Sequence, residues 1–173
     1  MNDPSPRKLV HGMPVYASRR FDRPRIFGIA ILSDFGSAVR GDEKRNNDAQ
    51  PNVYRSSEAM PETEWSYLAD IWNVGAMIWD LFEGKHMFYG YDPYKKNYTT
   101  SAHLAEVIGM LGPPPLDMLK RGERSPEFFT EDGPWKHEIE IPIPQQASLE
   151  ASEEYLEGRN TDMFMAFIRG MIQ

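Results

Sequence analysis

An acidic residue and a glycine follow closely on an apolar run in the first quarter of the chain. The run, Phe27 to Leu32, has the length of a β-strand, and Asp34-Phe35-Gly36 comes directly after it. A carboxylate at the end of a strand can hold Mg²⁺ against the phosphates of a nucleotide, and the glycine lets the backbone turn sharply. The same three residues could also form a polar turn between a strand and a loop.

A second carboxylate, Asp70, lies within the most apolar stretch, residues 65–84. Apolar residues recur there at helical spacing and cover most of the circumference, so we expect a helix buried in the centre of a domain, ending at Gly84. The residues at helical spacing are Ile71, Val74, Ile78, Leu81 and Phe82, and the remaining circumference is mostly covered by Leu68, Trp72, Met77 and Trp79. If buried, Asp70 needs hydrogen-bond donors; if exposed, an aspartate in the first helical turn is favoured by the helix dipole.

The order and spacing of these segments carry more information than any of them singly. Tyr54-Arg55-Ser56-Ser57-Glu58 follows the first carboxylate across a loop of about twenty residues, and Asp70 comes twelve residues after Glu58. In this arrangement the chain resembles a eukaryotic protein kinase, specifically its C-terminal lobe from the metal-binding loop onward. Within that superfamily it is most similar to the SR-protein (splicing-factor) kinases and their fungal relatives.

Further segments support the resemblance, which covers residues 24–173. They are Ser37-Ala38, Leu81-Phe82-Glu83-Gly84, His103-Leu104, Leu111-Gly112-Pro113-Pro114-Pro115 and Ser125-Pro126-Glu127-Phe128-Phe129.

The resemblance implies roles for the residues that match its motifs. Asp34-Phe35-Gly36 would form part of the cofactor site, with Asp34 coordinating Mg²⁺ that bridges the phosphates of ATP. Tyr54-Arg55-Ser56 would belong to the activation and substrate-docking segment, residues 37–58. Glu58 would pair with an arginine near the end of the lobe, and Asp70 would hydrogen-bond the backbone of the catalytic loop.

Other parts of the kinase pattern are missing from this sequence. It contains no Gly-x-Gly pair and no Val-Ala-Ile-Lys strand. The residues that follow its four histidines exclude a His-Arg-Asp or His-x-Asp loop. No catalytic residue can therefore be assigned, and we expect this chain to be catalytically incompetent and to bind neither ATP nor Mg²⁺ itself. The N-lobe and catalytic loop would lie ahead of Met1, and the arginine partner of Glu58 beyond Gln173, so the kinase lobe would be truncated at both ends.

The expected fold is mainly α: a helical bundle around a buried central helix, with one short strand region before the Asp34 loop and no N-lobe. Residues 1–23 are expected to be irregular, apart from a short strand at Val15-Tyr16, and residues 24–173 to form a partial kinase domain. Helices are expected at 101–111, 149–156 and 161–172, with short helical turns at 116–119 and 125–129.

Composition narrows the choice of partners. The formal charge of −7 carries no basic stripe, which argues against direct nucleic-acid binding. The sequence has no cysteine, no apolar run long enough to cross a membrane and no apolar core of a signal peptide. We therefore expect an intracellular protein, cytoplasmic or nuclear, without membrane partners.

Three functions remain open. The chain could be a fragment of a Ser/Thr kinase of the SR-protein type, whose partners would be Arg/Ser-rich proteins. It could be a non-catalytic binding module of the pseudokinase kind. It could also be an unrelated helical interaction domain in which the motifs are accidental. An in-frame HxD-x-K-x-x-x-N loop upstream in the transcript would separate the first function from the second.

Overall fold

A computed structural model describes residues 5–17, 28–43, 45–145 and 147–172. The chain divides into two units, residues 1–38 and 39–173. Within the described residues, no helix is both long and apolar enough to span a membrane.

A β-hairpin occupies the start of the first unit. Strands β1 (Arg7–Val10) and β2 (Met13–Tyr16) pair antiparallel, with Val10 opposite Met13. The two turn residues, His11 and Gly12, have φ of 51° and 81°, the left-handed pair that a tight two-residue hairpin requires. The sequence indicated a strand at Val15-Tyr16 in an otherwise irregular segment, and the structure places that strand in a regular hairpin.

The strand expected at Phe27–Leu32 is wrong for the residues that the structure describes, which exclude Phe27. Residues 28–34 are irregular, and Ile29, Ile31 and Leu32 are at least 80% exposed. A strand is stabilised by pairing with its neighbours, and within the described residues this segment has no strand partner. The short 3₁₀ helix η1 (Phe35–Ser37) follows.

Helix α1 (Tyr67–Glu83) confirms the predicted central helix, and it ends at Gly84 with a left-handed φ of 70°. Its burial differs from the expectation. The buried residues of the helix are Ala69, Trp72, Gly75, Ala76, Trp79 and Glu83. The residues whose spacing predicted the helix are largely exposed, with Leu81 at 78% and Ile71 at 45%, so the expected burial of the whole helix is wrong. The helix is apolar nearly all round, but the described parts of the second unit cover one face of it.

The 3₁₀ helix η2 (Asn52–Tyr54) precedes α1, and the other elements of the second unit follow α1 along the chain. Strands β3 (Tyr91–Asp92) and β4 (Asn97–Tyr98) form a small hairpin. Helix α2 (Thr100–Leu111) begins where the Thr99 side chain accepts a hydrogen bond from the Ala102 amide. The remaining helices are α3 (Leu116–Arg121), α4 (Ser125–Phe128), α5 (Leu149–Ser152) and α6 (Arg159–Arg169). All of the predicted helices are present, although α5 is shorter than expected.

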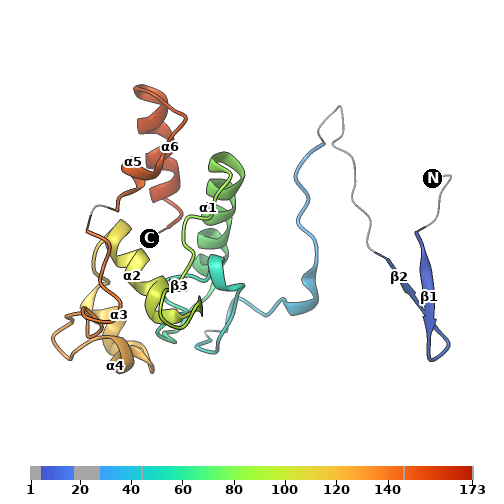
Figure 1. The fold of residues 1–173 in the computed structure, drawn as a ribbon, viewed down its shortest axis with the longest axis horizontal. Helices are drawn as coiled ribbons and strands as arrows, with labels where there is room; N and C mark the ends of the chain where they lie inside the picture. The colour runs from blue at the N-terminus through green and yellow to red at the C-terminus, as the bar shows by residue number, and fades with distance from the viewer. Residues whose placement is uncertain (1–4, 18–27, 44, 146, 173) are drawn as a thin grey trace. The chain divides into compact units, whose positions relative to one another are not determined.

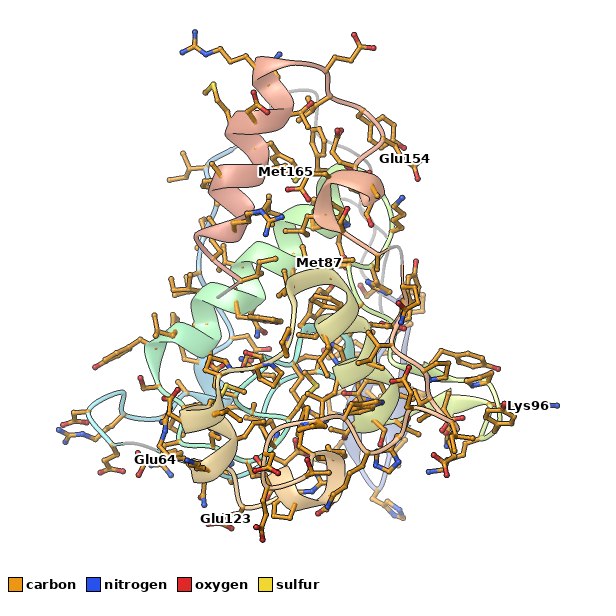
Figure 2. The ribbon with its side chains drawn as sticks, turned by 90° about the vertical axis from the view of Figure 1, so that its left-hand side faces the viewer. Glu64, Met87, Lys96, Glu123, Glu154 and Met165 are labelled. Carbon is orange, nitrogen blue, oxygen red and sulfur yellow. The ribbon has the colours of Figure 1, made fainter. Side chains whose placement is uncertain are left out.

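The core joins α1 to α2 and α6 (Figure 1). Trp72 stacks on Phe88 with ring centroids 5.9 Å apart, and Trp79 stacks on Phe164 at 6.1 Å. A Cβ atom on Gly75 would lie 2.9 Å from Cβ of Met171, so this glycine permits the close approach of the C-terminal segment to α1. Figure 2 labels two of the buried methionines, Met87 and Met165.

Candidate functional site

Residues 48–58, which we call the docking segment, are attached to the second turn of α1. The Gln50 side chain bridges them: its Nε2 donates to the carbonyl oxygen of Ala69 (2.8 Å), and its Oε1 accepts from the Ser56 amide (2.8 Å). Asn73 Nδ2 donates to the carbonyl oxygen of Tyr54 (2.9 Å). The side chains of Gln50 and Asn73 thus form hydrogen bonds with backbone groups of the docking segment and of α1. These bonds fix the path of the docking segment across the helix.

Arg55 is the main cation of the docking segment and is 9% exposed. Its guanidinium donates to the carbonyl oxygen of Ala49 (3.1 Å) and to Asn52 Oδ1 (3.1 Å), and lies 3.1 Å from a carboxylate oxygen of Asp48. The guanidinium also stands over the ring of Tyr98, 5.7 Å from its centroid. A planar group with five donors suits such a set of acceptors, and lysine could not replace it.

A buried histidine extends this network into α2. The Tyr98 hydroxyl lies 3.0 Å from Nδ1 of the fully buried His103. The same hydroxyl accepts a hydrogen bond from Arg55 at 3.5 Å. Burial, helped by the positive charge of Arg55, lowers the pKa of His103 to about 3. The imidazole is therefore neutral near pH 7, so Nδ1 can accept a hydrogen bond from the Tyr98 hydroxyl. This bond holds the ring of Tyr98 beside Arg55.

Tyr54 attaches the other side of the segment to the end of α1. Its hydroxyl donates to Oδ2 of Asp80 (2.7 Å), and Nδ1 of His86 lies 2.5 Å from the same oxygen. The hydrogen bond to Asp80 raises the pKa of Tyr54, with burial adding to the effect. Of the predicted docking residues, Tyr54 is held directly by α1, Arg55 by its own segment and Tyr98, and Ser56 by the side chain of Gln50.

A cavity of about 680 Å³ lies beside Glu58. Its lining includes Trp72, Leu104, Val107, Pro114, Arg121 and Arg169. Glu58 is partly exposed and accepts a hydrogen bond from the Ser57 hydroxyl (3.3 Å); no ion pair of Glu58 occurs within the residues that the structure describes. Arg169 is instead paired with Glu150 at 2.7 Å. The arginine partner of Glu58 remains a prediction.

Asp34-Phe35-Gly36 belongs to the first unit and lies on its surface. Asp34 has a left-handed φ of 65°, and Phe35 is 64% exposed. Within the described residues, no group of three or more His, Cys, Asp or Glu side chains could hold a metal ion. Mg²⁺ in nucleotide sites is held by carboxylates together with phosphates that the protein positions. One exposed carboxylate without a phosphate-binding loop does not fit an ATP·Mg²⁺ site.

Asp70 is exposed in the first turn of α1, whereas the sequence placed it on a buried helix. Its carboxylate therefore carries no burial penalty and is stabilised by the positive end of the helix dipole. We expect Asp70→Asn to reduce the free energy of unfolding by no more than about 1 kcal/mol, and less at high salt. Urea unfolding measures the change, with Asp162→Asn in the first turn of α6 as the matched control. A larger loss for Asp70→Asn would show that its carboxylate has a specific partner.

The sequence missed the residues that hold the docking segment in place. Gln50, Asn73, Asp80, Tyr98 and His103 were not assigned such a role. Asn73 and Asp80 did carry a signal, because polar side chains within a highly apolar helix need partners. Gln50 and Tyr98 carried none, since the partners that tie them to other segments, Ala69 and Arg55, lie 19 and 43 positions away.

Comparisons with known proteins show which proteins this chain is similar to. No protein-family model matches the chain. It is 45% identical to a serine/threonine protein kinase of Aspergillus fumigatus over 99% of the chain and 43% of that kinase. It is 34% identical to the dual specificity protein kinase lkh1 of Schizosaccharomyces pombe, and 32% identical to the serine/threonine-protein kinase SKY1 of Saccharomyces cerevisiae. Each of these matches covers 59% of the chain and 14% of the relative. The chain thus spans less than half the length of these relatives, which are serine/threonine and dual specificity protein kinases.

Proposed function

We propose that this chain corresponds to the C-terminal lobe of a Ser/Thr protein kinase of the SR-protein type, and that it docks protein without transferring phosphate by itself. The observation that carries the proposal is the match of nearly the whole chain to a fungal Ser/Thr kinase. The ordered motifs and the rigidly held docking segment support it. Such a protein would act inside the cell, in the cytoplasm or the nucleus.

The lack of catalysis by this chain is part of the proposal. The sequence contains no His-x-Asp loop, so no aspartate is available to accept the proton of a substrate hydroxyl. Loss of a general base typically lowers the rate by about 10²–10⁴. Asp34 is exposed, and no group of three or more His, Cys, Asp or Glu side chains in the described residues could hold a metal ion. We therefore expect this chain by itself to bind neither of the two cofactors implied by the resemblance, ATP and Mg²⁺.

A non-catalytic binding module of the pseudokinase kind is the second candidate. It is favoured because the docking segment is held in place although the sequence contains no catalytic loop. The residues that hold it are Gln50, Arg55, Asn73, Asp80 and Tyr98. The transcript separates the two candidates: an in-frame upstream HxD-x-K-x-x-x-N loop supports a kinase, and its absence supports the module.

Binding of a fluorescent Arg-Ser repeat peptide tests the docking function. We expect saturable binding that weakens as salt is raised, because a basic peptide meets a chain with a net charge of −7. A Gln-Ser peptide of equal length should not bind. Arg55→Ala should weaken binding by distorting the docking segment, and Arg159→Ala, at an exposed position on α6, should not. Absence of saturable binding, or equal binding of the control peptide, would refute the proposal.

A further inference from the structure

The last residue of α1, Glu83, is a buried acid without a hydrogen-bond partner. It is 4% exposed, and neither of its carboxylate oxygens makes a hydrogen bond within the described residues. It also lies at the C-terminal end of the helix, where the helix dipole opposes a negative charge. Each of these facts disfavours the ionised carboxylate and favours the neutral acid.

The groups around Glu83 act on its pKa in both directions, with a net upward shift. Burial raises the pKa of Glu83 and the charge of Glu153 raises it further; Lys85 lowers it, the charge of Glu154 raises it, and the backbone of Glu154 lowers it. Lys85 is already paired with Glu154, which lies in the loop after α5 (Figure 2). One turn earlier on α1, Asp80 is engaged with His86. The charged residues of α6, which packs on this end of α1 through Phe164, are Arg159, Asp162 and Arg169.

The loop of residues 153–157 packs on the end of α1 beside this acid. Tyr155 meets the ring of Phe82 edge-on, with centroids 6.0 Å apart. The carboxylate of Glu153 accepts hydrogen bonds from the backbone amides of Tyr155 (2.6 Å) and Leu156, which gives the loop its turn. Within the described residues, the contacts that hold this loop on α1 include the ring contact of Tyr155 with Phe82 and the ion pair of Glu154 with Lys85.

We propose that Glu83 is a proton-controlled switch for this loop: as a neutral acid it allows the loop to pack on α1, and its ionisation loosens that packing. Ionisation would bury a charge that is repelled by Glu153 and Glu154, and Lys85 and the backbone of Glu154 offset only part of that cost. Moving the loop away would admit water to the carboxylate and relieve both the burial and the repulsion.

The sign of the pH dependence follows from the raised pKa. A folded state that holds the proton more tightly than the unfolded chain is most stable at acid pH. This contribution is lost as pH rises from the ordinary glutamate value of 4.5 through the raised pKa of Glu83. The packing of the loop should weaken over the same interval.

Amide hydrogen exchange of Tyr155 and Leu156 in the full chain tests the switch. After correction for intrinsic exchange, we expect their protection to fall by about threefold or more as pH rises through this window, while amides of α2 stay protected. Glu83→Gln should keep the loop protected throughout, and Glu157→Gln, an exposed acid in the same loop, should behave as wild type. The side-chain carboxyl ¹³C resonance of Glu83 in the wild type supplies a readout that needs no variant. Unchanged protection in the wild type, the same fall in Glu83→Gln, or an ordinary titration midpoint for Glu83 would overturn the proposal.

Discussion

Replacing Arg55 with alanine is expected to lower the free energy of unfolding by about 2 kcal/mol, a substantial part of the stability of a domain. The guanidinium is nearly buried and contacts the carbonyl oxygen of Ala49, Asn52 Oδ1 and Asp48 at once. Alanine would remove the donor to the Ala49 carbonyl and the cation over the ring of Tyr98, while water can replace it at the exposed Asp48 and Asn52. Urea unfolding followed by tryptophan fluorescence measures the loss.

Two further variants show whether the loss comes from the geometry of the guanidinium. Arg55→Lys keeps the charge but cannot donate to several acceptors in one plane, so most of the loss should remain. Arg159→Ala removes an exposed arginine and should change little. If Arg55→Lys proved as stable as wild type, the charge of residue 55 would matter and its hydrogen bonds would not.

Local sequence patterns predicted the helices well. The 3–4 spacing, Gly84 after α1 and the prolines after Gly112 all act within a few residues, so the boundaries of α1 and α2 were close to those observed. The kinase relationship was also accessible from the order and spacing of short motifs, and the similarity of the chain to a fungal Ser/Thr protein kinase supports that relationship.

Burial could not be predicted in the same way. Residues of α1 at two different faces have helical spacing, and the sequence cannot tell which face its neighbours cover. The face of Trp72 and Trp79 is buried, and that of Ile71 and Leu81 is largely exposed. The expected burial of Asp70 was wrong for the same reason, because Asp70 lies on an exposed part of the helix. The apolar run before Asp34 had strand composition, but a strand forms only with a partner, which depends on distant chain.

The candidate site shows the same limit. The motif identified Tyr54, Arg55 and Ser56, because these residues are contiguous. The contacts that hold them, such as Arg55 to Tyr98 and Tyr54 to Asp80, join residues 43 and 26 positions apart. Such pairs leave no local pattern in a single sequence.

Phosphate transfer by the purified chain is the most direct test of the central claim, that a kinase-related chain docks protein without catalysing. With ATP, Mg²⁺ and an Arg-Ser repeat peptide, under conditions in which an active SR-protein kinase modifies the peptide, we predict no transfer above the uncatalysed background. The reason is that the sequence has no catalytic-loop aspartate and the structure has no complete Mg²⁺ site in its described part. Asp34→Ala should be indistinguishable from wild type. Stoichiometric transfer by the wild type that disappears in Asp34→Ala would contradict the claim.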